Sequence, residues 1–325
     1  MNVIETAGLS KSYGRKRVVE ALDLTVRRGE IYGFVGRNGA GKSTVMKMLA
    51  GLAIPTEGRI SMFGEPLAPG SASRRVGALI ESPGVLPGLN GFDNVMCRAL
   101  SLGVVDAKHA SSEALSMVGL ADVAKKRVKS YSLGMKQRLG LALALVGSPD
   151  LLLLDEPFNG LDPQGVREVR DLVTTLARDR GVTVFISSHV LDQLERMVTR
   201  YGVLREGRLV KELSAEEVER ACADYVLVRC TAPQLAVVAL QDAAPEARCA
   251  LMEDDAIRVQ GIDTETAGRA LAAAGVVVTE LSVHENDIED LFIDLMGGKD
   301  DAESAAPASR AVARVSFSKG GGRRA

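Results

Sequence analysis

A glycine-rich loop between an apolar run and a helical segment constrains this chain more than any other stretch. The loop, residues 36–44, follows the apolar run 31–35 and precedes residues 45–50, whose side chains predict a helix. It fits the pattern G-x-x-x-x-G-K-[ST] and reads Gly36, Arg37, Asn38, Gly39, Ala40, Gly41, Lys42, Ser43, Thr44. A strand, this loop and a helix, in that order, are the context in which the motif binds nucleotide phosphates. The chain is therefore predicted to fold around a phosphate-binding loop.

The residue types in the loop predict how it would hold ATP and Mg²⁺. The glycines let backbone N–H groups turn toward the phosphates, and the helix N-terminus adds the positive end of its dipole. Lys42 is expected to neutralise the β- and γ-phosphate oxygens, and the Ser43 hydroxyl to take a Mg²⁺ position. The alternative, a glycine-rich turn with a chance lysine, leaves the flanking strand and helix unexplained.

Composition excludes several other classes of protein. The net charge of −2 gives no basic field for nucleic acid. No apolar run approaches the ~20 residues of a membrane helix, and residues 1–5 lack the start of a signal peptide. The four cysteines stand far apart without a CxxC pair, which predicts buried free thiols in a reducing compartment. We expect a cytosolic nucleotide-binding protein that can still dock on a membrane.

Apolar runs alternate with helical spacing along the first two thirds of the chain. We expect short strands at 18–26, 31–35, 59–63, 75–80, 151–154 and 182–187, and helices at 106–129, 134–146 and 164–179. Strands that alternate with helices predict a parallel sheet covered on both faces. Residues 1–215 are therefore predicted to form an α/β domain of the P-loop NTPase class.

The pattern changes after residue 213. Strands and helices are expected in the order β-α-β-β-α-β at 225–230, 233–241, 248–252, 256–260, 265–274 and 276–283, followed by a closing amphipathic helix at 285–296. That order is typical of a ferredoxin-like split βαβ unit. Residues 216–297 are thus predicted to be a small α+β accessory domain. Residues 298–325, rich in Gly, Ala, Ser and charge, are predicted to be a disordered tail.

Two carboxylates end the apolar run 151–154. Asp155 is placed to hold Mg²⁺ through water, and Glu156 to polarise an attacking water. An apolar strand that ends in Asp-Glu also occurs often by chance. The functional interpretation of Asp155 and Glu156 therefore depends on the motifs that precede and follow them in the sequence.

A second anion site is predicted about twenty residues before this pair. Ser132 and Gly134 open the helix at 134–146, where a hydroxyl, a backbone amide and the helix dipole can hold an anion. Two phosphate-binding helix ends in one chain suggest that each serves a nucleotide shared with a second copy. Further along, Gly160-Leu161-Asp162 follows the carboxylates, and His189 comes just after the strand at 182–187, where an imidazole can reach a γ-phosphate.

In the order and spacing of these elements, the chain resembles the ATP-binding-cassette (ABC) ATPases over about residues 1–215. The resemblance implies that Tyr13 stacks on adenine and that Glu156, His189 and Lys42 are catalytic. It also implies that Ser132, Gly134 and Asp162 act across a head-to-tail dimer on the ATP of the partner copy. Such subunits work with integral-membrane permease subunits on the inner face of the cell membrane, and no nucleic-acid partner is expected.

The departures from the family pattern are informative. The signature usually reads Leu-Ser-Gly-Gly-Gln, whereas residues 131–135 read Tyr-Ser-Leu-Gly-Met and keep the Ser and the second Gly. Glu81 replaces the usual Gln after the strand at 75–80. Its carboxylate can bind Mg²⁺ more strongly than an amide carbonyl. Both departures resemble the bacitracin and lantibiotic resistance branch, whose members power efflux of, or self-protection against, peptide antibiotics.

The leading hypothesis is therefore the ATP-hydrolysing subunit of an exporter. Two copies would close around two ATP molecules and pass the motion to membrane subunits through residues 82–105. The apolar side chains Phe92, Val95 and Met96 in that segment fit a core equally well. A soluble ATPase of the same fold acting on ribosomes or DNA is the alternative, but such proteins usually carry two cassettes or a long coiled coil. A small-molecule phosphotransferase should lack the element at 131–137.

Overall fold

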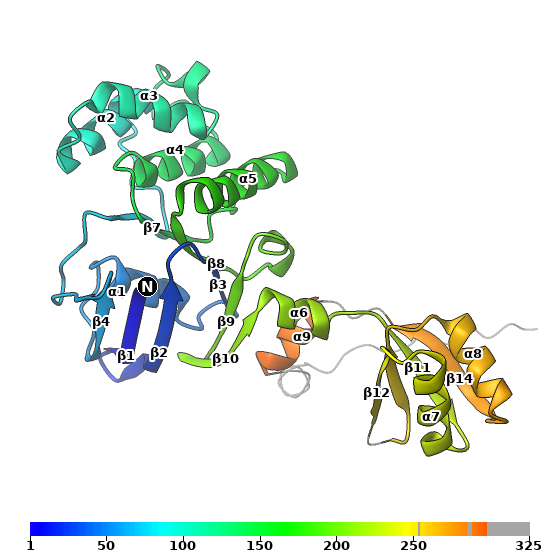
Figure 1. Cartoon of the computed structure of the whole chain (residues 1–325). Helices are drawn as coiled ribbons and strands as arrows, with labels where there is room; N and C mark the ends of the chain where they lie inside the picture. Colours follow the sequence, from blue (N-terminus) through cyan, green and yellow to red (C-terminus); the bar gives the residue numbers. More distant parts are fainter. Residues whose placement is uncertain (253, 285–287, 298–325) are drawn as a thin grey trace, which may run out of the picture.

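Three sheets organise the chain, which a computed structural model describes over residues 1–252, 254–284 and 288–297 (Figure 1). The first sheet is antiparallel and contains the N-terminus. Its strands, in order across the sheet, are β2 (Lys16–Arg27), β1 (Asn2–Tyr13), β4 (Glu57–Met62) and β5 (Glu65–Pro66). The expected strands at 18–26 and 59–63 correspond to β2 and β4, whereas β1 was not predicted.

The second sheet carries the phosphate-binding loop. Its order is β10 (Arg208–Ser214), β9 (Arg200–Arg205), β3 (Ile31–Val35), β8 (Thr183–Ser188), β7 (Leu151–Asp155) and β6 (Val76–Leu79). All neighbouring strands are parallel except β9 and β10. Every residue of β3, β7 and β8 is buried, which explains their continuous apolar runs. The predicted parallel sheet is confirmed, and the carboxyl ends of its central strands meet at one edge.

Five helices belong to this first domain: α1 (Lys42–Leu49), α2 (Gly91–Leu102), α3 (Ala107–Met117), α4 (Leu133–Leu145) and α5 (Pro163–Arg180). Figure 1 shows α2, α3 and α4 gathered on the side away from β1 and β4. The expected helix at 106–129 is wrong beyond Met117. Gly119 has a φ of 69°, a left-handed conformation that ends a helix, and only short 3₁₀ turns follow it.

The third sheet forms the centre of the accessory domain. Its elements follow in the order β11 (Tyr225–Cys230), α7 (Pro233–Ala243), β12 (Arg248–Leu251), β13 (Ile257–Gln260), α8 (Thr264–Ala273) and β14 (Val278–His284). The strands lie in the order β12-β13-β11-β14, with every pair antiparallel. This arrangement confirms the ferredoxin-like prediction. The domain has its own buried core, which includes Val228, Leu240, Ile257 and Leu271.

Two helices flank the accessory domain and pack against the first domain instead. Val218 of α6 (Ala215–Ala221) and Phe292 of α9 (Ile288–Leu295) are buried in the core that includes β3, β7 and β8. The Phe292 ring meets Tyr201 of β9 edge-on, with 5.3 Å between ring centroids. Figure 1 shows α9 beside α6 and apart from the third sheet. The expected boundary at 215/216 and the expected role of the last helix in closing the accessory domain are therefore wrong, because both helices bury apolar side chains on the first domain.

Two further expectations concern exposure. All four cysteines are free, as expected, but Cys97 is exposed and the other three are only half-buried. Over the part of the chain that the structure describes, no helix is long and apolar enough to cross a membrane. The expected disordered tail at 298–325 lies outside the described residues.

Candidate nucleotide-binding and catalytic site

The phosphate-binding loop leads from β3 into α1 and encloses its lysine. The Lys42 side chain is only 6% exposed. Its Nζ donates to the carbonyl oxygens of Gly36 at 2.6 Å and Arg37 at 3.3 Å. Burial lowers the pKa of the Lys42 ammonium, while the charges of Glu156 and Asp155 oppose that shift. The loop thus holds the buried lysine through two of its own backbone carbonyls.

One hydroxyl, that of Ser187, contacts both acidic residues at the end of β7. Ser187 lies opposite Asp155 in the parallel register of β7 and β8. Its Oγ donates to Asp155 Oδ1 at 2.6 Å and accepts the Glu156 N–H at 3.0 Å. Glu156 has a φ of 49°, an uncommon backbone conformation for a residue other than glycine. Ser187 therefore orients both acidic residues. This role was not predicted from the sequence, because it depends on the pairing of β7 with β8 and not on a motif.

Three of the predicted catalytic residues meet at the Glu156 carboxylate. Its Oε2 lies 2.8 Å from Nδ1 of His189, and its Oε1 lies 3.7 Å from Nζ of Lys42. Because a carboxylate only accepts, the Nδ1 of His189 carries the hydrogen in this contact. The Glu156 side chain is 18% exposed, so solvent still reaches it. The site combines a shielded cation with a positioned carboxylate at the edge where the strands end.

The residues of the second anion site lie at two helix N-termini that contact each other. Ser132 caps α4 by accepting the Met135 N–H at 3.2 Å, and Asp162 caps α5 by accepting the Gly165 N–H at 2.9 Å. A Cβ added to Gly134 would lie 3.3 Å from the Gly160 carbonyl oxygen. Gln137 of α4 donates to the Glu156 carbonyl at 3.4 Å, which links this helix to the carboxylate strand.

Two predicted residues lie at the margin of this arrangement. Tyr13, at the end of β1, is 51% exposed, and the Lys11 ammonium lies 4.9 Å above its ring. Glu81 has a φ of 59°, and its carboxylate forms an ion pair with Lys47 of α1 at 2.5 Å. Ser43, Glu81 and Asp155 offer hydroxyl and carboxylate oxygens, which are ligands that suit Mg²⁺. Among the described residues, no three His, Cys, Asp or Glu side chains form a metal-binding group.

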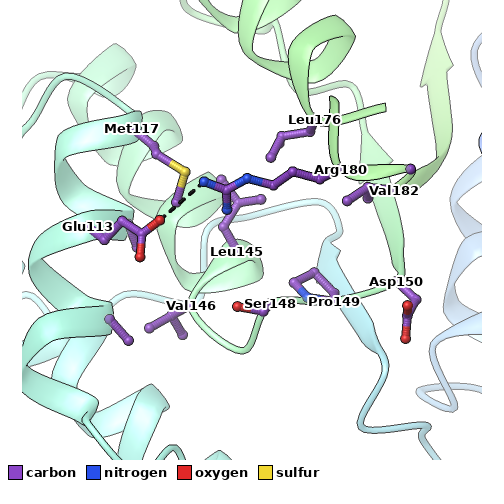
Figure 2. A pocket seen from close by; sticks show the side chains of 13 residues that line it. Glu113, Met117, Leu145, Val146, Ser148, Pro149, Asp150, Leu176, Arg180 and Val182 are labelled. Atoms are coloured by element: carbon purple, nitrogen blue, oxygen red, sulfur yellow. Dashed lines mark hydrogen bonds and ion pairs between the residues drawn. The ribbon is translucent and has the colours of Figure 1, made fainter. Parts of the chain in front are cut away.

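A separate cavity of about 210 Å³ lies at the amino ends of β7 and β8 (Figure 2). It is lined by Met117, Leu145 and Leu176 and bordered by an ion pair between Arg180 and Glu113 at 3.2 Å. It also touches Asp150 and Val182, which precede β7 and β8. The phosphate-binding loop lies at the opposite, carboxyl ends of the parallel strands, so this cavity is not part of the site.

The fold and the site together define the class of protein. Residues 19–159 match the sequence profile of the ABC transporter family. A solved ATP-binding subunit of an ABC transporter has a TM-score of 0.61 and 28% identity, covering 67% of this chain and 92% of that one. With the full-length relative described next, these matches show that the chain belongs to the ATP-binding proteins of ABC transporters.

Two curated relatives narrow the comparison. The bacitracin transport ATP-binding protein BcrA of Bacillus licheniformis is 38% identical over 300 residues, covering 91% of this chain and 98% of that protein. The lantibiotic transport ATP-binding protein SrtF of Streptococcus pyogenes is 39% identical over 210 residues, covering 65% of this chain and 90% of that protein. The predicted resemblance to this branch is confirmed, and an ATPase without a transport role is not favoured.

Proposed function

We propose that this protein hydrolyses ATP to drive export of, or self-protection against, a peptide antibiotic or another drug through separate membrane subunits. One observation carries the catalytic half of this proposal. The Glu156 carboxylate, held by His189 at 2.8 Å, lies beside the lysine of the phosphate-binding loop at 3.7 Å. Such a carboxylate can orient water for attack on the γ-phosphate that the lysine binds.

In the proposed reaction, water attacks the γ-phosphorus of ATP and the bond to the β-phosphate oxygen breaks, leaving ADP and phosphate. The loop N–H groups and Lys42 bind the phosphate oxygens and offset their charge. Glu156 accepts a hydrogen bond from the attacking water, and His189 holds that carboxylate in place. Ser43, Asp155 and Glu81 would hold a Mg²⁺ ion, which would offset negative charge on the phosphates. Tyr13, half exposed at the end of β1, would stack on the adenine.

The second anion site would serve the ATP of a partner copy. Ser132 and Gly134 open α4, and Asp162 opens α5, so two helix dipoles point from one surface. In a head-to-tail dimer, this surface of each copy would face the phosphate-binding loop of the other copy. Two complete ATP sites would result, each built from both copies. The proposed dimer therefore closes when ATP is bound and opens after hydrolysis.

The membrane subunits would dock beside α2. A cavity of about 410 Å³ there is lined by Ser82, Pro83, Leu86, Asn94, Cys97 and Arg98, among others. Leu86, which lines this cavity, is 53% exposed and would offer an apolar contact to a partner helix. Of the apolar residues considered in the sequence, Val95 is fully buried and belongs to the core, with Phe92 and Met96 packed partly against it. We therefore assign the proposed docking role within residues 82–105 to the side chains that line this cavity rather than to Phe92, Val95 and Met96.

The exported compound is inferred from the relatives, whose names specify bacitracin and lantibiotic transport. To test this, Glu156→Gln protein would be trapped with MgATP in native membranes, solubilised and purified with its partners. We expect a multi-spanning membrane protein to co-purify at stoichiometric level, with the present protein bound peripherally on the inner face of the cell membrane. Recovery of ribosomes or nucleic acid in its place would contradict the transport role while leaving the ATPase site intact.

Glu81 should influence how turnover depends on Mg²⁺. We expect Glu81→Gln to raise the Mg²⁺ concentration for half-maximal ATPase activity several-fold, because an amide oxygen is a weaker ligand than a carboxylate. The matched control is Lys47→Met, which removes the partner of Glu81 at 2.5 Å but keeps the carboxylate. Nucleotide binding at a series of Mg²⁺ concentrations gives a second readout. Superimposable titrations for Glu81→Gln and the parent would remove Glu81 from the metal site.

Removing the Ser187 hydroxyl should slow ATP hydrolysis more than removing another buried hydroxyl does. We expect Ser187→Ala to lower turnover by about 10- to 100-fold, the range seen for groups that orient metal ligands. The reason is that it would release both Asp155 and the Glu156 backbone. The matched control is Ser188→Ala, since Ser188 is equally buried but donates to the Val190 carbonyl at 3.0 Å. Equal losses in phosphate release for the two variants would count against an orienting role.

A further inference from the structure

We propose that Phe292 and Met296, in and just after α9 (Ile288–Leu295), are positioning residues for the phosphate-binding loop, so that this helix, which follows the accessory domain, sets ATP affinity. This inference rests on the proposed function. Helix α9 lies some 250 residues after the loop in the sequence. Figure 1 nevertheless shows it beside α6, on the side of the first domain where β9 and β10 lie.

The first step of the argument is how firmly α9 is anchored. Phe292 is fully buried and meets Tyr201 of β9 edge-on at 5.3 Å between centroids. Leu291 and Leu295 pack partly against the same core. Aromatic pairs of this geometry contribute beyond the area they bury. The helix is thus fixed to β9 rather than to the accessory domain that precedes it.

The second step is the contact between β9 and the loop. A Cβ added to Gly36 would lie 2.5 Å from the Leu204 carbonyl oxygen, so the start of the loop rests directly on the end of β9. At the turn after β9, the Gly207 N–H donates to the Ala40 carbonyl at 2.9 Å. The strand that carries Tyr201 therefore also supports the loop at two points.

The third step is a direct approach of α9 to the loop. Met296, the residue after α9, lines a cavity of about 210 Å³ together with loop residues 37–40. Leu204 and Glu206 complete the wall on the side of β9. Met296 is only partly buried, and its backbone N–H donates to the Phe292 carbonyl at 2.9 Å. Phe292 thus anchors the helix, and Met296 lines the cavity beside the loop.

This arrangement has a consequence for the accessory domain. The chain leaves the first domain through α6 and returns to it through α9, so the accessory domain is tied to the first domain at both ends. A movement of that domain that displaces α9 would act on β9 and the loop together. The affinity for ATP would then change with the position of the accessory domain.

The test uses the full-length chain and a fluorescent ATP analogue. We expect Phe292→Ala to raise the dissociation constant for the analogue by about 2- to 30-fold, the range that corresponds to mutations between coupled sites. The Michaelis constant for ATP should rise while the maximal rate is retained, a split that a merely structural defect would not produce. The matched control is Ile293→Ala in the same helix, whose side chain is 42% exposed. Phe292→Leu should recover most of the affinity. Binding is measured well below the unfolding temperature of each variant.

Two further variants separate the possible failures. Lys42→Ala should lose nucleotide binding; if it binds as the parent does, the proposed ATP site itself is wrong. If Lys42→Ala fails to bind but Phe292→Ala binds as tightly as Ile293→Ala, the inference about α9 is overturned. If Phe292→Ala does not fold, Met296→Ala decides: weaker binding supports the inference, and parental affinity overturns it.

Discussion

The Glu156→Gln variant should bind MgATP with near-parental affinity and hydrolyse it about 10²- to 10⁴-fold more slowly, the contribution typical of a positioned general base. The amide keeps the size of the side chain but cannot accept a proton from water. Binding should survive because the substitution leaves in place the groups proposed to hold the phosphates, Lys42 and the loop N–H groups. Phosphate release measured at saturating ATP, alongside binding of a fluorescent ATP analogue, gives both quantities.

A control distinguishes loss of the base from loss of the local structure. His189→Ala keeps the carboxylate but removes its partner at 2.8 Å, so it should slow turnover less than Glu156→Gln does. A Glu156→Gln protein that retains half the parental rate would exclude Glu156 as the base. Catalysis would then rest on binding of the ATP phosphates by the loop, without a general base from Glu156.

Several features of the fold were predictable because they are local. The strand, glycine loop and helix at 31–50 form one motif, and the apolar run 151–154 could be buried only in a sheet covered on both faces. The β-α-β-β-α-β order gave the accessory domain in the same way. By contrast, α9 looked like part of that domain because it follows it directly. Its partner Tyr201 lies about ninety residues earlier, and sequence spacing carries no signal for such a contact.

In the candidate site too, residues in local motifs were predictable, whereas contacts between residues far apart in the sequence were not. The sequence motifs identify Lys42, Glu156 and His189 individually. Lys42 and His189 meet at the Glu156 carboxylate because all three residues follow neighbouring parallel strands, β3, β7 and β8. The Ser187 contacts depend on the register between β7 and β8, which the sequence does not specify. Likewise, the Glu81 ion pair joins α1 to a loop thirty-four residues later. Pairings of this kind arise from tertiary packing and appear only in the folded structure.

The second large effect concerns the surface proposed to face the ATP of a partner copy. In the Glu156→Gln background, MgATP should drive two copies into a stable dimer, and Gly134→Asp should abolish that dimer. The new carboxylate would stand at the N-terminus of α4, where the γ-phosphate of the partner's nucleotide is expected. Like charges brought together at an interface cost several kcal/mol, which weakens association by about a hundredfold or more at 1.4 kcal/mol per decade. Sedimentation velocity with and without MgATP measures the dimer directly.

The matched control for this effect is Gly134→Ala, because a Cβ there meets the Gly160 carbonyl oxygen at 3.3 Å and requires only a small shift. It should weaken the dimer slightly, so that the difference between Ala and Asp isolates the charge. Gly134→Asp protein should still bind ATP as a monomer, since Lys42 and its loop belong to the same copy and remain unchanged. If monomeric Gly134→Asp also loses ATP binding, Gly134 acts on the nucleotide of its own chain. The head-to-tail arrangement would then have to be abandoned in favour of a site completed within one copy.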